Sequence, residues 1–125
     1  MTNPTRHRRF TRQFLPLNGD AAKAALTAYE SMRNAALALL SWRMIPHDST
    51  PDGIAAAFRQ AFYDTELFFD PFVGGKFAQY YFAAHEQRYQ LYDAEKAHRL
   101  IEEAQLFIEA SHACYGRLSA QKVAA

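Results

Sequence analysis

The chain has 125 residues, and hydrophobic residues make up 50% of it and aromatic residues 14%, which excludes a disordered protein and allows one buried core. The formal net charge of +1 excludes a domain that is strongly basic throughout, and a single cysteine excludes an intrachain disulfide. No apolar run is long enough to cross a membrane and no secretory signal pattern is seen, so we expect a soluble, cytoplasmic protein with no membrane partner.

The charges divide the chain into two parts. Four arginines precede the first acidic residue, Asp20, and the remaining ten of the 14 basic residues face 13 acidic ones. We therefore predict a basic, largely mobile arm over residues 1–13 and a helical bundle domain over residues 14–121. Such an arm would bind nucleic-acid phosphates with salt-sensitive affinity, so one alternative function is a nucleic-acid-associated small subunit. The residues concerned are Arg6, Arg8, Arg9 and Arg12.

The first helix is predicted to follow a short apolar segment. Large apolar residues between Phe10 and Leu17 suggest an extended stretch that lies across the bundle. Asp20 then has the character of an N-cap, and Pro46 ends a helix that should reach about Ser41 or Arg43. Its buried stripe is predicted to be Ala25, Tyr29, Met32, Ala36, Leu39 and Leu40.

A second helix is predicted to begin at Pro51, with Thr50 as its N-cap. It should end near Phe69, because Pro71 and two glycines follow. Its inner face is predicted to be Ile54, Phe58, Ala61, Phe62 and Thr65.

Residues 76–119 contain no proline and only one glycine, near the end. Their apolar residues form two helical stripes whose phase slips around residues 85–96. Two structures fit this slip: one long bent helix, which we favour, or two helices with Asp93 as the N-cap of the second. No strand pattern is present. The predicted fold is therefore all-α, an up-and-down helical bundle of three or four helices with a long, possibly bent C-terminal helix.

Aromatic residues crowd the second half of the chain and fall on more than one side of the predicted long helix. A helix of this kind must be covered by its own bundle or by another chain. We therefore predict a non-enzymatic interaction protein, an adaptor, regulator or small subunit of an assembly, that binds a protein partner or forms a homodimer. The predicted contact residues are Phe69, Phe72, Tyr81, Tyr89 and Tyr92.

Two Glu-x-x-His pairs suggest a second alternative, a ferritin-like metal-binding bundle. Glu95 with His98, and Glu109 with His112, each place a carboxylate and an imidazole on one helical face. The pairs lie on one helix about 21 Å apart, so one chain cannot bring them to a single metal site. An antiparallel dimer that crosses near Glu103 would bring the pairs of two chains together.

Enzymatic motifs are incomplete. The segment 97–100 resembles the start of the histidine phosphotransfer motif, but Ile101 and Glu102 stand where that motif has Lys and Gly. Residues 77–85 resemble a helix of HEPN ribonucleases, yet no Arg precedes a His at the spacing that this family uses. There is also no Gly-rich phosphate loop and no cysteine-based zinc pattern. We therefore predict no enzyme, no cofactor and no small-molecule substrate.

Overall fold

The computed structural model describes residues 18–124, and within this range it is an all-α bundle, as predicted. The four arginines of the basic arm and the apolar segment 10–17 lie outside the described residues. The elements are α2 (Asn18–Trp42), α3 (Pro51–Phe58), the π-helical turn η1 (Arg59–Tyr63), α4 (Lys76–Glu86) and α5 (Ala94–Ala124).

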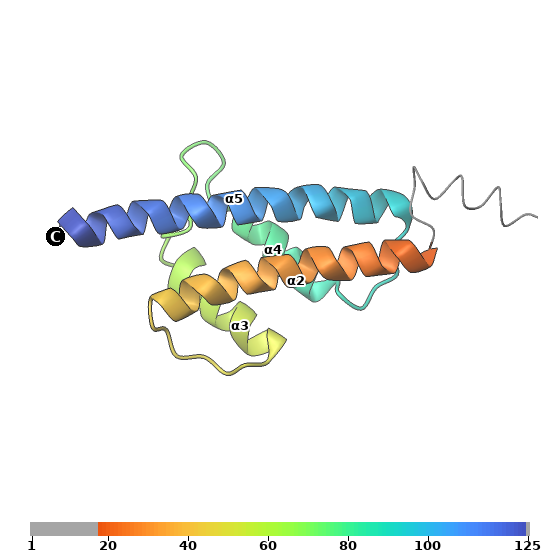
Figure 1. Cartoon of the computed structure of the whole chain (residues 1–125), viewed down its shortest axis with the longest axis horizontal. Helices are drawn as coiled ribbons and strands as arrows, with labels where there is room; N and C mark the ends of the chain where they lie inside the picture. The colour runs from red at the N-terminus through yellow and green to blue at the C-terminus, as the bar shows by residue number, and fades with distance from the viewer. Residues whose placement is uncertain (1–17, 125) are drawn as a thin grey trace, which may run out of the picture.

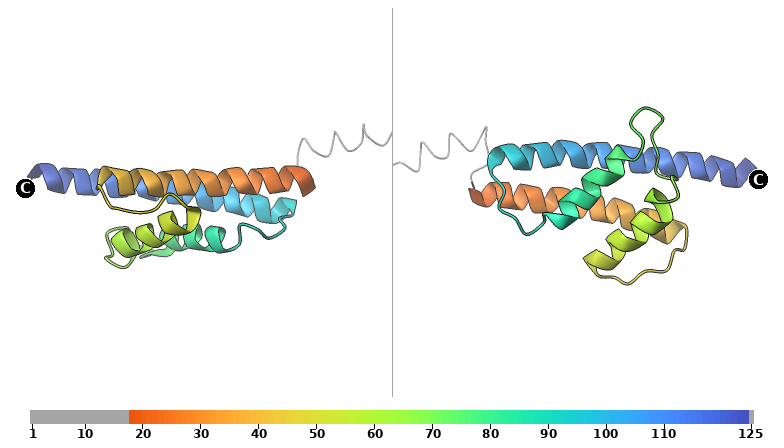
Figure 2. Two further views of the ribbon diagram at one scale, coloured as in Figure 1. Left: turned by 90° about the horizontal axis from the view of Figure 1, so that it is seen from below. Right: turned by 180° about the vertical axis from the view of Figure 1, so that it is seen from behind.

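The helices form two layers (Figures 1 and 2). Helices α2 and α5 lie side by side and run in the same direction, and α3 and α4 pack beneath them, antiparallel to each other. The rings of Trp42 and Tyr115, near the C-terminal ends of α2 and α5, are 4.7 Å apart, in keeping with this orientation. The loop before α3 and helix α4 each carry the chain back toward the start of α2, so α2 and α5 do not alternate in direction (Figure 1).

Helix α2 has the buried stripe that its sequence predicts, since all six stripe residues are buried. The helix begins two residues before Asp20, which therefore lies in the first turn, where its negative charge complements the helix dipole. At the other end Met44 adopts a left-handed conformation with φ 59°. Ile45 N–H donates to the Leu40 carbonyl at 2.9 Å, which completes a Schellman-type cap without glycine.

Helix α3 begins as predicted, because the Thr50 side chain accepts a hydrogen bond from Gly53 N–H at 3.0 Å. The predicted end near Phe69 is wrong: helical structure stops at Tyr63, and Thr65 is exposed rather than buried. The chain turns through Glu66, whose φ is 61°. Phe68 N–H then bonds the Phe62 carbonyl at 2.9 Å, and this turn directs the Phe68 ring back into the core.

The favoured single helix over residues 76–119 is wrong, and the alternative with two helices is confirmed. Residues 87–93 form a corner between α4 and α5. Asp93 is the N-cap of α5, since its carboxylate accepts from Lys96 N–H at 2.8 Å. The break corrects the phase slip: both apolar stripes, which a straight helix would direct to different sides, now face one core.

That core is a cluster of aromatic rings around Phe58. The centre of its ring lies 5.2 Å from Phe62 and Phe68, 5.6 Å from Phe107 and 5.7 Å from Tyr81. All five rings are at most 3% exposed. They come from α3, η1, the following turn, α4 and α5, so one cluster joins the lower layer to α5.

Two tyrosines in this region differ in their hydrogen bonding. The Tyr81 hydroxyl is buried and has no partner in the described part of the chain, whereas the Tyr29 hydroxyl bonds His85 Nδ1 at 2.8 Å. Burial raises the pKa of both phenols, because the charged form loses its hydration. Both side chains are therefore held neutral in the folded protein, but only Tyr29 gains a hydrogen bond.

We predict that Tyr81→Phe leaves the free energy of unfolding unchanged or raises it by up to about 1 kcal/mol, because it removes an unpaired buried hydroxyl. Tyr29→Phe should lower it by about 1 kcal/mol, because His85 loses a partner. Chemical denaturation of both variants measures the difference, and equal losses would contradict it. Because the folded pKa of Tyr81 is raised, wild-type stability should fall as the pH rises above about 10, and Tyr81→Phe should fall less.

Candidate interaction surfaces

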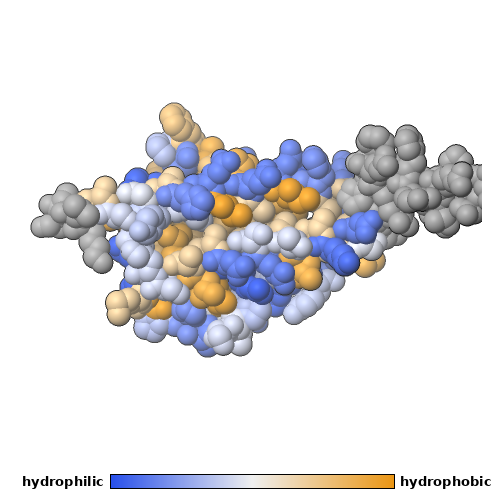
Figure 3. All heavy atoms as spheres, in the orientation of Figure 1, coloured by the Kyte–Doolittle hydropathy of each residue, from blue (hydrophilic) through white to orange (hydrophobic). Residues whose placement is uncertain are grey.

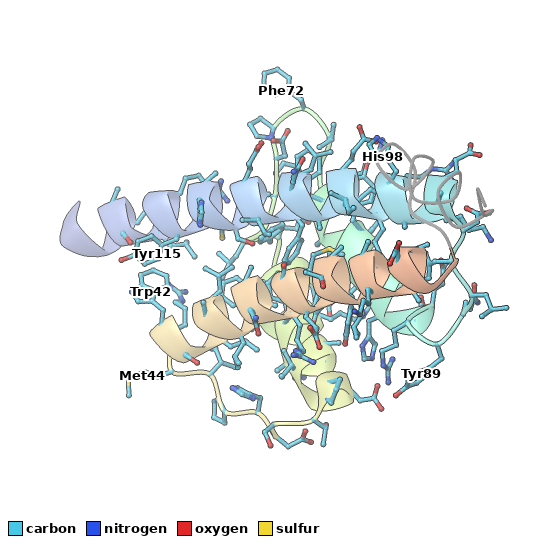
Figure 4. The ribbon with its side chains drawn as sticks, turned by 45° about the vertical axis from the view of Figure 1, so that its right-hand side comes forward. Trp42, Met44, Phe72, Tyr89, His98 and Tyr115 are labelled. Carbon is cyan, nitrogen blue, oxygen red and sulfur yellow. The ribbon has the colours of Figure 1, made fainter. Side chains whose placement is uncertain are left out.

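The loop between η1 and α4 projects past the edge of α5 and carries Phe72 at its tip (Figures 1 and 4). We call residues 69–74 the Phe72 loop. Asp70 and Gly74 exchange two backbone hydrogen bonds, of 2.9 and 2.8 Å. The Asp70 carboxylate also accepts from the N–H groups of Phe72, at 2.7 Å, and Val73, at 3.1 Å. Gly74 has φ 63°, a conformation that favours glycine.

The base of this loop is tied to the rest of the bundle. The Leu67 carbonyl accepts a hydrogen bond from the Arg117 guanidinium at 2.8 Å and a weaker one from the Cys114 thiol at 3.4 Å. A side chain at Gly75 would come within 2.7 Å of the Tyr63 ring, so the chain packs closely where it enters α4. The loop is therefore held both by its own hydrogen bonds and by its attachment to α5 and η1.

This loop exposes a group of apolar side chains. Phe72 is 92% exposed, Phe69 46% and Val73 40%. Water contact with such side chains is unfavourable by roughly 1.5–3 kcal/mol each relative to full burial. Because Asp70 already orders the backbone, burying them against a partner would cost little conformational entropy.

A second exposed apolar group lies at the opposite edge of the molecule, in the corner between α4 and α5 (Figure 4). Tyr89 is 86% exposed and Leu91 93% exposed. The Arg88 guanidinium lies 4.6 Å from the centre of the Tyr89 ring. Tyr92 is half-buried and lines a polar cavity of about 250 Å³ between α4 and α5, together with Glu103. Burial raises the pKa of both Tyr92 and Glu103.

A hydrogen-bonded chain next to this corner joins three helices. His85 of α4 bonds the Tyr29 hydroxyl of α2 through Nδ1 at 2.8 Å and the Asp52 carboxylate of α3 through Nε2 at 2.7 Å. Arg88 lies 3.3 Å from the same Asp52 oxygen. With the proton on Nε2, a neutral His85 donates to Asp52 and accepts from Tyr29, so both bonds form at once. Tyr29 is 3% exposed and the His85 side chain 12%, whereas the Asp52 side chain is 79% exposed, so these bonds fasten the three helices from the buried Tyr29 to the surface at Asp52.

No local pattern in the sequence indicates the hydrogen bonds among Tyr29, His85 and Asp52. Asp52 and His85 are 33 positions apart, and Tyr29 and His85 are 56 apart. The only signal was that His85 stands at the end of an apolar helical stripe, which does not identify its partners.

The five aromatic residues predicted to contact a partner do not form one surface. Phe69 and Phe72 share the Phe72 loop, whereas Tyr89 and Tyr92 belong to the corner at residues 87–93. Figure 4 shows Phe72 and Tyr89 at opposite edges of the molecule. The prediction for Tyr81 is wrong, because this residue is fully buried in the aromatic core. Met44, just after the end of α2, and Leu91 are also exposed, and neither was among the predicted contact residues.

The four residues of the metal hypothesis all lie exposed on α5, and Figure 4 shows His98 near its N-terminal end. His98 Nε2 is 3.9 Å from a carboxylate oxygen of Glu102, which is 63% exposed. Within residues 18–124 no group of three or more His, Cys, Asp or Glu side chains is placed to hold a metal ion. The Glu95–His98 and Glu109–His112 pairs are separated along one helix. A metal site shared between the pairs of two chains stays a prediction.

Comparison of the chain with family models, curated proteins and solved structures finds no match. Among residues 18–124, no helix combines the length and apolar character needed to cross a membrane. The exposed apolar surfaces, and above all the Phe72 loop, are therefore the features that bear on function.

We predict that Asp70→Ala loosens the Phe72 loop without unfolding the bundle, because it removes the acceptor of two loop N–H groups. Amide hydrogen exchange at Phe72 and Val73 should accelerate by about tenfold, which corresponds to roughly 1.4 kcal/mol of local stability. Asp64→Ala, at the end of η1, is the matched control. Unchanged exchange at both amides would contradict the role assigned to Asp70.

Proposed function

We propose that this protein is a non-enzymatic interaction protein, an adaptor or small subunit of an assembly, that binds a protein partner through its Phe72 loop. The observation that carries the proposal is the 92% exposure of Phe72 at the tip of an ordered loop. A single exposed apolar side chain is ordinary on a protein surface. What favours binding here is the combination of a large ring, apolar neighbours and a backbone that is already ordered.

The chemistry of the loop defines the kind of partner. Phe72 and Val73 would occupy an apolar pocket, and Phe69 would cover its rim. Interfaces typically draw most of their affinity from a few such aromatic anchors that become fully desolvated. The preordered loop raises the affinity further, because fewer rotations are lost on binding.

A binding function is also favoured over catalysis by the use of the polar residues. Tyr29, His85 and Asp52 come closest to an acid–base relay in the described part of the chain, and both ring nitrogens of His85 are bonded, one to Tyr29 and one to Asp52. The free thiol of Cys114 is buried, and burial raises its pKa, which disfavours the reactive thiolate. Neither the His85 ring, whose nitrogens are both bonded, nor the buried thiol is free to act on a substrate.

We predict that Phe72→Ala removes the partner while the fold is unchanged. Proteins that copurify with the wild-type chain from its own cells should be lost from the Phe72→Ala variant. Leu91→Ala is the matched control, because Leu91 is 93% exposed, as Phe72 is, but lies in the corner between α4 and α5. With the purified partner, Phe72→Ala should raise the dissociation constant about 30-fold or more, as expected for an anchor that contributes about 2 kcal/mol to binding.

Thermal unfolding should give the same midpoint for both variants and the wild type, because neither side chain is packed in the fold. Retention of every copurifying protein by Phe72→Ala would contradict the proposed function. Loss of the same proteins from Leu91→Ala would assign the binding to the α4–α5 corner instead.

A further inference from the structure

The polar cavity of about 250 Å³ between α4 and α5 is the α4–α5 cavity of the following paragraphs. The two helices diverge toward the corner at residues 87–93, and the corner joins them at the wide end of this wedge (Figure 2). Ala84 and Leu100, which are at most 5% exposed, give the cavity an apolar floor. Lys96, Arg99 and Glu103 line it from the α5 side.

This polar lining distinguishes the cavity from the outer face of the α2–α5 layer. The outer face carries an apolar groove of about 540 Å³. Figure 3 shows this face, where an apolar strip runs along the molecule between two hydrophilic rows. The α4–α5 cavity instead combines charges of both signs. A ligand of the cavity would therefore be held by charge and hydrogen bonds more than by apolar contact.

The three charged residues of the cavity are neighbours on α5. Lys96 and Arg99 are three positions apart, and Arg99 and Glu103 are four apart. The ion pairs found within residues 18–124 all involve other side chains. Burial raises the pKa of the Glu103 carboxyl, and this effect outweighs the opposite effect of the nearby Arg99. The charged form of Glu103 would therefore gain from a closer cation.

The other polar groups of the cavity come from α4 and the corner. They are the phenols of Tyr80 and Tyr92 and the side-chain amides of Gln87 and Gln90. In the described part of the chain none of these four side chains has a hydrogen-bond partner, whereas both ring nitrogens of the nearby His85 are bonded. The corner is also ordered, since Gln90 N–H donates to the Gln87 carbonyl at 3.0 Å. Convergent polar groups on an ordered wall are typical of a site for a small ligand.

We propose that the α4–α5 cavity binds a free α-amino acid with a small polar side chain. The carboxylate of the ligand lies between Lys96 and Arg99, and its ammonium group contacts Glu103. Its side chain faces the amides and phenols of the opposite wall.

The arrangement of charges favours this class of ligand. The carboxylate and the ammonium group of an α-amino acid are bonded to one carbon, so they can bridge oppositely charged side chains that are neighbours on a helix. A phosphate ester or a dicarboxylate would bring a like charge to Glu103, and a simple amine would bring one to Lys96 and Arg99. The cavity leaves room for roughly eight water molecules at about 30 Å³ each, which suits a ligand of about ten non-hydrogen atoms.

This binding site is separate from the Phe72 loop. The cavity is lined by the corner that carries Tyr89, and Figure 4 shows Tyr89 and Phe72 at opposite edges of the molecule. An amino acid in the cavity therefore leaves the Phe72 loop free to bind a protein partner. The two proposals can fail independently of each other.

Titration of the wild-type chain with L-serine, L-asparagine and L-glutamine tests the proposal. At least one of them should shift the backbone amide signals of Lys96, Arg99 and Glu103 in NMR spectra, with a dissociation constant below about 1 mM. The tightest of the three is then compared with two analogues, its amide, which lacks the carboxylate, and its des-amino form, which lacks the ammonium group. Each analogue should bind about tenfold more weakly or worse, because it loses one charge-assisted contact.

Two variants assign the charges of the ligand to side chains. Glu103→Gln should weaken binding of the amino acid about tenfold but leave the affinity for the des-amino analogue unchanged, because that analogue has no ammonium group. Arg99→Gln should weaken the amino acid in the same way and leave the affinity for the amide analogue unchanged. Glu102→Gln is the matched control, because this neighbouring carboxylate is 63% exposed and outside the cavity lining.

The outcomes that would overturn the proposal are distinct. One is the absence of binding by all three amino acids at about 10 mM. Another is binding of acetate or inorganic phosphate as tightly as the amino acid, because Lys96 and Arg99 would then hold an anion without Glu103. A third is equal weakening of amino acid and analogue by Glu103→Gln, which would indicate a distorted cavity. Thermal unfolding at an unchanged midpoint shows that each variant is folded.

Discussion

The packing of aromatic rings around Phe58 is the interaction on which the rest of the structure depends. Phe58 contacts rings from η1, the turn after it, α4 and α5, so one side chain connects segments spread over 50 positions of the sequence. Truncating a buried ring of this size to alanine typically costs about 3–5 kcal/mol, a large part of the total stability of a domain. Helices α3 and α4 are too short to be stable alone, and this cluster holds them in place.

The position of that core determines which surfaces remain available. Because α3 and α4 pack on one side of the α2–α5 layer, its other side is left with an apolar groove. Because the chain must travel from Phe68 in the core to the start of α4, the Phe72 loop extends past the edge of the layer. The hydrogen bonds from Tyr29 through His85 to Asp52 fasten the other end, where the exposed Asp52 carboxylate and the buried Tyr29 hydroxyl satisfy both nitrogens of the His85 ring. Fold and candidate interaction surfaces thus have the same physical origin.

Phe72 and Tyr81 illustrate why the site was only partly predictable. Both are aromatic residues in the crowded region, and both were assigned to the same contact surface. Tyr81 lies on the inner face of α4 and is fully buried, whereas Phe72 lies at the tip of a loop and is 92% exposed. Which aromatic side chains are covered depends on where neighbouring helices lie, and the spacing of residues within one segment does not contain that information.

Local chemistry was enough to predict the all-α class, the Thr50 cap and the buried stripe of α2, because each depends on residues within a few positions of one another. The turn after Tyr63, the choice of a corner at residues 87–93 over one long helix, and the common direction of α2 and α5 were decided only by the tertiary structure. At the turn and at the corner the backbone gives up regular helix, at Glu66 even with a left-handed residue, so that apolar side chains distant in sequence reach one core. The free energy gained by burying these side chains exists only once the segments that cover them are in place.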